Sequence, residues 1–593
     1  MSFMYDPIPY DENSALNKIH GLSQKRILFG VELICDELLN NWKDNEIIAL
    51  DGYLSADFER IIRTLKEKDA SIKFFSTTSY MKSKEEISKM LKDYLPHDPL
   101  KDPYDLFGKL YSETIESFFK KEKIELEKNS KICLYGFGSS SDIFKDQVSK
   151  VIYIDLTPKD AVIRAQDQEY ETIGDAQKGN FKDLMRRYYY IDIEVAMKQR
   201  KKLIQSSKID YYVLETWQNK WMMMAADTLN YIFQNLSSQP FRTKPIYLDG
   251  VWGGHYIRRI RNVPKDIAPR IAWSFEFIPL EASILVGYEN EFIDIPFYTF
   301  LNACENEIMG NQVNKRFNGN FPVRFNYDDT WHSSGNMSIQ CHPNKAYALE
   351  NYNEDNSQDE AYYVVATGQD ARTYCGFNTN ADNFIEKCRK AFELREPLDY
   401  KKYVHSEKSY NGLQVFIPAG TIHGSGRNQV VLELGSFTVG AYTYKMYDYN
   451  RKDINGTFRP IHLENAKEVL DTKRDEKWIR ENSVIDPILI KETNDYSEYI
   501  IGKNPYMYYE THQIKLTSDG VYIASNNDEF TVLTLCEGEE VVIYDINHPS
   551  RKYNVNYLDV IVVPASIKEY GVKVTCNHPV VLHKTILKKE GGM

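Results

Sequence analysis

The chain has 593 residues, 42% of them hydrophobic, and this length exceeds what one hydrophobic core can organise, so we expect about two to four domains. Its net charge of −12 argues against a nucleic-acid-binding protein, which needs a basic surface, whereas a small anionic substrate needs only a few local cations. The eight cysteines form no Cys-x-x-Cys pair, so we expect reduced thiols in a cytoplasmic protein. Neither a leader-like segment nor an apolar run of about 20 residues is seen, so we expect a protein that does not enter a membrane.

Residues 1–240 alternate strand-like and helix-like patterns. Short apolar runs predict strands at 46–53, 71–78, 131–138 and 150–157. Apolar residues at helical spacing predict helices at 54–68, 102–128, 186–205 and 227–239. Because strands that alternate with helices favour parallel pairing, we expect an α/β domain over residues 1–240.

The strand, turn and helix at 46–68 resemble the start of a P-loop nucleoside kinase, but the full pattern Gly-x-x-x-x-Gly-Lys-[Ser/Thr] is absent. Without that lysine and hydroxyl, the segment has no obvious grip on nucleotide phosphates or Mg²⁺. A second turn, GFGSSSD at 136–142, follows a strand and is a candidate anion-binding turn. The resemblance implies a degenerate kinase-like domain without ATPase activity, whose role would be regulation, dimerisation or ligand sensing.

From about residue 243 the pattern changes to short β-like runs separated by turns, with helix-like insertions at 297–310 and 383–395. This alternation is typical of a jelly-roll barrel, and it recurs between 495 and 590. The expected fold class is therefore multidomain, α/β followed by mainly β. We place the jelly roll at 241–490 and a second barrel at 491–593.

Four side chains of the mainly β region form a metal-ligand set. Gln340 and His342 stand two apart in a predicted strand, so both point to the same face. Glu360 begins the next predicted strand, and His423 follows the tight turn Pro-Ala-Gly-Thr. Because adjacent strands can bring an amide, two imidazoles and a carboxylate together, the sequence predicts a site for a divalent metal.

The same segments resemble class I mannose-6-phosphate isomerases, the zinc cupins. The motifs follow the family's order as PIYLDGVWGG at 245–254, SIQCHP at 338–343, Glu360, PAGTIH at 418–423 and TYKMYDYNR at 443–451. The resemblance implies that the metal, Zn²⁺ or another divalent ion, is bound by Gln340, His342, Glu360 and His423. It also implies a cupin barrel with a helical insertion, followed by a second cupin-like barrel.

The implied reaction is the reversible isomerisation of a hexose 6-phosphate between aldose and ketose through a cis-enediol, which needs cations for the phosphate and for developing charge. Lys445 stands where the family carries an arginine, and lysine lacks the planar two-pronged contact of arginine. Gln358 and Asn326 stand where the family carries lysines. Arg324, two residues before Asn326, is a candidate substitute, and Arg451 closes the last motif. The candidate catalytic residues are therefore Lys445, Arg451 and Arg324.

Three hypotheses remain open. The first is an isomerase that converts mannose 6-phosphate to fructose 6-phosphate, or acts on a related sugar phosphate, without a nucleic-acid or membrane partner and with homo-oligomerisation left open. The second is a non-catalytic sugar- or nucleotide-responsive binding protein, which the altered cations would suit. The third is another metal cupin such as an oxygenase. Oxygenases typically use two histidines and one carboxylate, so Gln340 and the TYKMYDYNR segment argue against the third.

Overall fold

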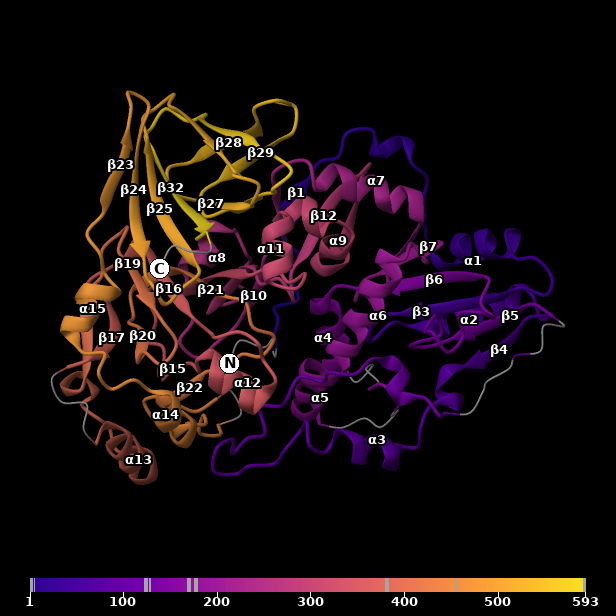
Figure 1. Cartoon of the computed structure of the whole chain (residues 1–593), viewed down its shortest axis with the longest axis horizontal. Helices are drawn as coiled ribbons and strands as arrows, with labels where there is room; N and C mark the ends of the chain where they lie inside the picture. The colour runs from indigo at the N-terminus through magenta and orange to yellow at the C-terminus, as the bar shows by residue number, and fades with distance from the viewer. Residues whose placement is uncertain are drawn as a thin grey trace.

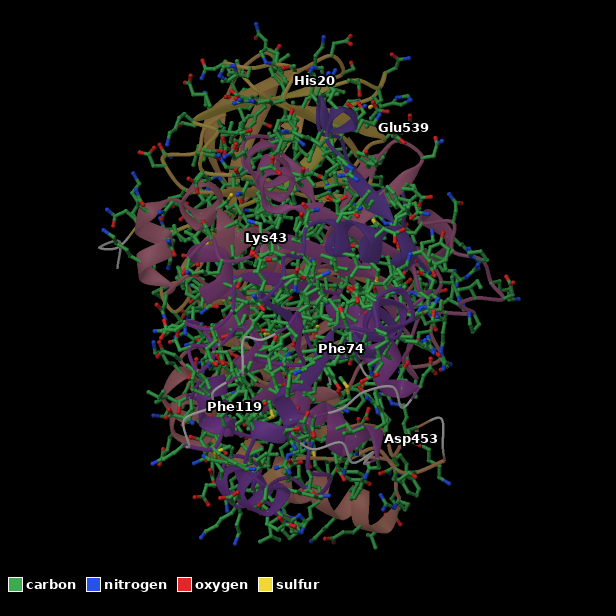
Figure 2. All side chains as sticks on the ribbon, turned by 90° about the vertical axis from the view of Figure 1, so that its right-hand side faces the viewer. His20, Lys43, Phe74, Phe119, Asp453 and Glu539 are labelled. Carbon is green, nitrogen blue, oxygen red and sulfur yellow. The ribbon has the colours of Figure 1, made fainter. Side chains whose placement is uncertain are left out.

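The computed structural model describes residues 4 and 6–589, apart from 122–125, 127–129, 168–171, 175–179, 379–382 and 454–455. Figure 1 shows an α/β part on the right and a mainly β part on the left. Figure 2 looks onto the α/β side, where polar side chains such as that of the exposed Lys43 cover the surface. Within the described ranges, no helix is both long and apolar enough to cross a bilayer.

The α/β part, residues 27–236, is built on a seven-stranded sheet ordered β2-β8-β7-β6-β3-β5-β4. The predicted parallel pairing is confirmed for β3 (Ile47–Gly52), β4 (Lys73–Ser76), β5 (Ile132–Tyr135), β6 (Lys150–Asp155) and β7 (Tyr211–Glu215). Two antiparallel strands complete one edge, β8 (Trp221–Ala225) and β2 (Ile27–Phe29). Alternate residues of β3 enter two different hydrophobic clusters, one on each face, so the whole strand is buried.

Three predicted helices of this part are confirmed, α2 (Phe58–Lys68), α6 (Ile193–Gln205) and α7 (Ala226–Leu236). The helix predicted at 102–128 is wrong over 102–121, which contains only the short 3-10 helix η3 (Ile115–Phe118), and most of the remainder lies outside the described residues. Phe107 packs instead against Tyr352 and Tyr444 of the mainly β residues 241–593, which we call the β half, and the amide of Leu110 donates to the Tyr352 carbonyl oxygen at 2.8 Å. Helical spacing was therefore overridden by tertiary contacts.

The turn at 136–142 does not offer its amides to an external anion. The backbone N–H groups of Gly138 and Ser140 donate to the carboxylate of Asp51 at 2.9 and 3.1 Å. Asp51 is fully buried at the end of β3, where it needs those donors. The anion-binding interpretation of this turn is therefore wrong, because an internal carboxylate already occupies it.

The two-sheet part, residues 246–447, contains two antiparallel sheets that face each other. The six-stranded sheet has the order β10 (Ile246–Leu248), β11 (Trp273–Phe277), β14 (Val323–Asp329), β21 (Gln429–Ser436), β16 (Glu360–Thr367) and β19 (Gln414–Ile417). The five-stranded sheet has the order β18 (Val404–Lys408), β17 (Arg372–Phe377), β20 (His423–Ser425), β15 (Ile339–Cys341) and β22 (Tyr444–Tyr447). The predicted helical insertions correspond to α9 (Phe297–Ala303), α10 (Glu305–Met309) and α13 (Phe384–Leu394).

The C-terminal part, residues 488–587, again has two sheets. The larger has the order β23 (Ile488–Glu492), β24 (Tyr496–Lys503), β25 (Tyr509–Leu516), β32 (Val580–Leu587), β27 (Thr531–Glu537), β30 (Val560–Val563) and β9 (Phe241–Arg242). The smaller has the order β26 (Val521–Ser525), β31 (Glu569–Val574), β28 (Glu540–Asp545) and β29 (Lys552–Asn556). β9 comes before residue 243 in the sequence, yet it pairs with β30 in this sheet. The C-terminal part is therefore joined to an earlier segment of the chain by strand pairing as well as by chain continuity.

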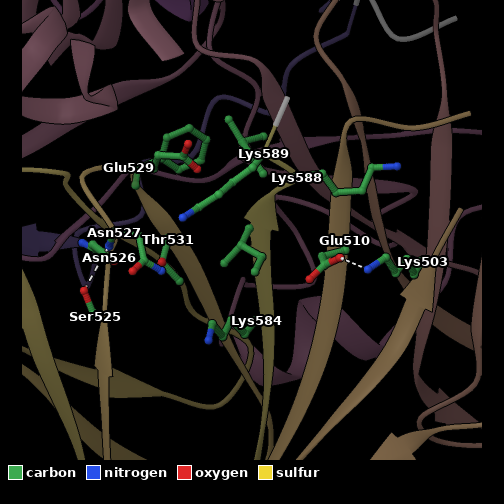
Figure 3. Close-up of a pocket in the computed structure, with 13 residues that line it drawn as sticks. Lys503, Glu510, Ser525, Asn526, Asn527, Glu529, Thr531, Lys584, Lys588 and Lys589 are labelled. Atoms are coloured by element: carbon green, nitrogen blue, oxygen red, sulfur yellow. Dashed lines mark hydrogen bonds and ion pairs between the residues drawn. The ribbon is translucent and has the colours of Figure 1, made fainter. Parts of the chain in front are cut away.

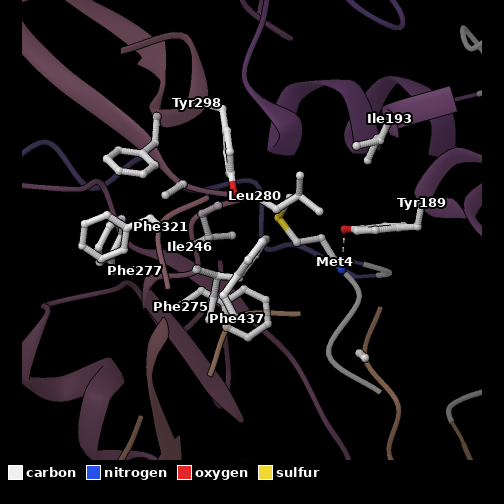
Figure 4. Packing of buried hydrophobic residues seen from close by; sticks show 14 of the residues in the cluster. Met4, Tyr189, Ile193, Ile246, Phe275, Phe277, Leu280, Tyr298, Phe321 and Phe437 are labelled. Carbon is white, nitrogen blue, oxygen red and sulfur yellow. Dashed lines mark hydrogen bonds between the residues drawn. The ribbon is translucent and has the colours of Figure 1, made fainter. Parts of the chain in front are cut away.

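The two halves share one hydrophobic core. Met4 is fully buried, and its backbone amide donates to the Tyr189 hydroxyl at 3.3 Å. Figure 4 shows Met4 between Tyr189 of the α/β part and Leu280 of the β half. The segment then follows β10, where the amide of Ile8 donates to the Tyr247 carbonyl oxygen at 2.8 Å. Apolar packing across this junction therefore fixes how the halves are oriented.

Candidate metal centre

Three strands deliver the predicted ligands into the space between the facing sheets. β15 carries Gln340 and leads directly into His342, while β20 begins at His423. These two strands pair so that Gln340 lies opposite His423. Glu360 begins β16 in the facing sheet. Because side chains alternate along a strand, the register of each strand decides that these residues point inward.

His342, Glu360 and His423 converge in a closed site. His342 Nε2 lies 3.2 Å from Glu360 Oε1, and His423 Nε2 lies 3.4 Å from Glu360 Oε2. One candidate ligand atom from each residue falls within 4.8 Å of the others, and none of the three residues is more than 2% exposed. Two imidazoles and a carboxylate at this spacing form a donor set that suits Zn²⁺ and related divalent ions.

Hydrogen bonds behind the imidazoles fix which nitrogen faces the site. The Nδ1–H of His342 donates to the Tyr442 carbonyl oxygen at 3.1 Å, and the Nδ1–H of His423 donates to that of Thr421 at 2.9 Å. A carbonyl oxygen can only accept, so each neutral ring keeps a lone pair on Nε2. Burial lowers the pKa of His423, which favours the neutral ring that a metal binds.

The inward-facing atoms have no donor to satisfy them. Among the described residues, Nε2 of His342, Nε2 of His423 and Oε2 of Glu360 are buried without a hydrogen-bond partner. Converging acceptors that lack a donor are unfavourable in a protein interior, and a cation relieves this. The residues present therefore fit a bound divalent metal.

Gln340 lies at the edge of this group. Its Oε1 accepts a hydrogen bond from Ser338 Oγ at 2.8 Å, and it lines the same small cavity as Glu360. An amide oxygen has two lone pairs, so the bond from Ser338 leaves one for a metal. Its role as a fourth ligand stays a prediction.

Lys445 reaches the same cavity from β22, where it is the cross-strand partner of Gln340. The residue is 1% exposed, and among the described residues its Nζ has no hydrogen-bond partner. Burial, together with the charges of Arg459 and Arg451, lowers the pKa of Lys445 to about 7. An amine with this pKa can exchange a proton near neutral pH.

The two predicted arginines have different surroundings. Arg324 lines the cavity, and its Nη2 lies 2.6 Å from Glu360 and 3.2 Å from Glu433. Arg451 pairs with Asp448 and donates from Nη1 to the Asn336 carbonyl oxygen at 2.6 Å. It is not among the described residues that line the cavity. The structure thus brings Arg324 to the ligands and holds Arg451 behind them.

Sequence reasoning missed three charged residues at this centre. Arg459 lines the cavity with Lys445, and Glu433 on β21 pairs with Arg324. Burial, followed by the charges of nearby carboxylates, raises the pKa values of Glu433 and its neighbour Asp328. The available signal was one glutamate inside the otherwise apolar run of β21, because a strand buried on both faces keeps a charge only where it has a partner.

An aromatic layer from both halves supports the site from behind. The ring of Tyr442, whose carbonyl holds His342, stacks on Tyr352 with centroids 4.3 Å apart. Phe107 of the α/β part meets Tyr444 edge-on at 5.6 Å and lies 5.3 Å from the ring of His462. The α/β part therefore contributes directly to the packing behind the predicted metal ligands.

A second cavity, of about 340 Å³, opens at one end of the C-terminal sheets (Figure 3). Lysines contribute much of its lining, but two are already neutralised. Lys503 pairs with Glu510 at 3.5 Å, and Lys584 pairs with Glu498 at 3.0 Å. This cavity is therefore a poorer candidate for chemistry than the metal centre.

Together, the fold and the site define a two-sheet β protein with a buried His–Glu–His centre and an added α/β part. The chain is a distant homologue of mannose-6-phosphate isomerases. It is 22% identical to that enzyme of Bacillus subtilis over 270 residues, which cover 45% of this chain and 80% of the relative. It is 25% identical to the Streptococcus mutans enzyme over 239 residues, which cover 38% and 68%.

The solved structure of the mannose 6-phosphate isomerase from Bacillus subtilis superposes on this chain with a TM-score of 0.45 and 18% identity. The superposition covers 59% of this chain and 100% of the Bacillus subtilis chain. Residues 30–238 match a family described as a domain of unknown function, DUF8485. That match gives no support to the kinase-like interpretation of the α/β part.

Proposed function

We propose that the chain is a metal-dependent aldose–ketose isomerase that acts on mannose 6-phosphate or a related sugar phosphate. The observation that carries the proposal is the set of buried, unpartnered acceptor atoms on His342, Glu360 and His423, beside a buried lysine of lowered pKa. The distant homology to mannose-6-phosphate isomerases supports the same reaction class.

In this proposal His342, Glu360 and His423, with Gln340, hold Zn²⁺ or another divalent ion. Bound there, the ion would supply Lewis acidity for the sugar oxygens. The hydrogen bonds from the two Nδ1–H groups keep both rings oriented with Nε2 towards the ion. The closed packing around these residues excludes water, which strengthens electrostatic interactions in the site.

Lys445 is our candidate for the proton transfer. Isomerisation moves a proton between C1 and C2, so one base must accept it from one carbon and return it to the other. The free amine of Lys445 has no competing hydrogen bond among the described residues, and its pKa of about 7 leaves much of it uncharged at neutral pH. Arg324 and Arg459 line the same cavity and would stabilise negative charge on the enediol and the substrate.

The non-catalytic alternative has two specific observations in its favour. Arg324, the candidate substitute for the family's lysine, is engaged by both Glu360 and Glu433. Asn326, at the lysine position itself, donates to Asp328 at 3.0 Å and carries no charge. A protein that binds a sugar without turning it over would tolerate this loss of free cations.

The test is a coupled assay for interconversion of mannose 6-phosphate and fructose 6-phosphate on full-length protein of known metal content. We expect turnover that a chelator abolishes and Zn²⁺ restores. Lys445→Met should lose turnover, whereas Lys452→Met, an exposed lysine seven positions along the chain, should not. Metal-loaded protein that turns over no hexose 6-phosphate would favour the binding alternative.

A further inference from the structure

A cavity of about 710 Å³ lies between the two halves of the molecule, apart from the metal centre. Helix α6 of the α/β part forms one wall, and α9 with the loops at 316–320 and 353–357 forms the other. Helices α6 and α9 lie side by side at this junction in Figure 1. By contrast, the cavity at the metal centre measures only about 30 Å³. We call the larger one the interdomain cleft.

The lining of the interdomain cleft suits a molecule with many hydroxyl groups. Its lining includes the amides of Asn302, Asn318, Asn320, Asn353 and Asn356 and the hydroxyl of Ser357. Such amides donate and accept at once, as sugar hydroxyls also do. The rings of Phe317, Phe437 and Tyr508 add apolar faces between them.

One of these amides has an unmet hydrogen-bond donor. Asn302 is only 4% exposed, and among the described residues its Nδ2 has no acceptor. A buried amide donor without an acceptor is unfavourable and uncommon in folded proteins. A ligand oxygen in the cleft would satisfy it, so this residue points to an occupant independently of the size of the cavity.

The charges of the cleft favour an anion. Its cations are Lys198, Lys201, Arg316 and Lys345, against the acidic Glu194, Glu354 and Asp355. Lys345 pairs with Asp355 at 3.0 Å and Lys201 with Glu305 at 2.7 Å. Burial raises the pKa values of Glu194 and Glu354 and so favours their neutral forms. In a chain of net charge −12, this concentration of cations is a local feature.

The two α6 lysines point in different directions, Lys198 towards the α/β part and Lys201 towards the opposite wall. Lys198 Nζ donates to the carbonyl oxygens of Tyr111 and Ser112 at 2.7 and 2.9 Å, and it lies 4.0 Å from the carboxyl of Glu194, whose raised pKa favours its neutral form. Lys201 pairs with Glu305 at 2.7 Å, and a side chain at Gly319 would collide with its Nζ. Lys201 therefore reaches across to the 316–320 loop.

The cleft also borders the segment that presents a metal ligand. Residues 353–357 line the cleft, Gln358 follows them, and Glu360 begins β16. Gln358 Nε2 donates to Glu360 Oε1 at 3.2 Å. Val439 lines both the cleft and a small neighbouring cavity, which Arg324 and Gln358 also line. An occupant would thus contact the segment that leads to Glu360.

We propose that the interdomain cleft is a second ligand site, which binds a phosphorylated sugar with its phosphate at Lys198 and Lys201 and its hydroxyls at the asparagines, Asn302 among them. The segment 353–357 carries the effect of binding to Glu360. This site gives the α/β part a role in ligand sensing, and it goes beyond the proposed isomerisation without depending on it.

The test is calorimetric titration of mannose 6-phosphate into the full-length His423→Ala variant, in which the metal centre is disabled. We expect one binding event to remain. Lys201→Met in that background should weaken it by at least about tenfold, the cost of losing one charge-assisted hydrogen bond. Lys202→Met is the matched control, because Lys202 is the next residue of α6, pairs with Asp142 at 2.5 Å and does not line the cleft. It should leave the affinity unchanged.

Asn302→Leu, which keeps the side-chain shape and removes the unpaired donor, should also weaken binding, and unphosphorylated mannose should bind more weakly than its phosphate. Failure of His423→Ala to bind, or binding that neither Lys201→Met nor Asn302→Leu alters, would overturn the cleft proposal. Turnover by the wild type would still support the isomerase in that case. Binding in the cleft without any turnover would support the cleft and contradict the isomerase.

Discussion

Replacing Phe107 with alanine tests whether the α/β part supports the metal centre. Phe107 is 4% exposed, and its ring lies 6.3 Å from that of Tyr442 and 5.6 Å from that of Tyr444. Tyr442 supplies the carbonyl that orients His342. Removing the Phe107 ring leaves a cavity into which Tyr442 can relax, so we expect its carbonyl to hold His342 less firmly.

Two magnitudes follow from this geometry. Truncating a buried phenylalanine to alanine typically costs about 3–5 kcal/mol of folding free energy. Disturbing the hydrogen-bond partner of a metal-bound histidine typically weakens metal binding about 10- to 100-fold. Phe107→Ala should show both losses.

Phe144→Ala is the matched control, because Phe144 is fully buried in the same part, with ring contacts to Phe119 and Tyr80 at 5.6 and 5.8 Å. It should lose similar stability without losing zinc affinity. The assay is urea unfolding, paired with zinc competition against a chelator of known affinity. Equal zinc affinities in the Phe107 and Phe144 variants would refute the reasoning.

Four further outcomes are expected. His423→Ala should lose bound zinc with little change in metal-free stability. His405, which pairs with Glu407 at 2.8 Å, is the control, and His405→Ala should keep the metal. Stoichiometric zinc in both variants would contradict the site. Lys445→Met should keep zinc and lower turnover by about 100-fold or more. The wild-type rate should rise with pH through about 7 as the Lys445 amine loses its proton, and a flat profile would remove it as the base. Burial, with the charge of His512, lowers the pKa of His583 in the folded protein to about 3, whereas an unfolded histidine titrates near 6.5. The free energy of unfolding should therefore be highest above about pH 6.5, and it should fall by about 1.4 kcal/mol per pH unit on acidification towards pH 3. Urea midpoints at two pH values should show a shallower fall for His583→Leu, and parallel slopes would exclude this histidine.

The sequence determined the local chemistry of the metal centre. Period-two alternation placed Gln340 and His342 on one strand face, and the Pro-Ala-Gly-Thr turn placed His423 at a strand start. These are short-range properties of the chain, because the direction of a side chain follows from strand geometry and turn type. The parallel strands of the α/β part could be predicted for the same reason.

Only the tertiary structure decided how these pieces meet. It set Glu360 opposite the two imidazoles, engaged Arg324 with Glu433 and held Arg451 on Asp448 behind the cavity. The first two pairings join strands far apart in sequence. Asp448 and Arg451 are only three residues apart, so distant contacts decide only where this pair lies relative to the cavity.

The segment at 102–121 shows the same limit. Its helical spacing could be read locally, yet Phe107 and Leu110 pack on the β half instead. The interdomain cleft likewise is lined by α6 and the 353–357 loop, which are far apart in sequence. Local periodicity records which side chains share a face, whereas burial against a remote partner decides which face is covered, and no single segment of the sequence contains that information.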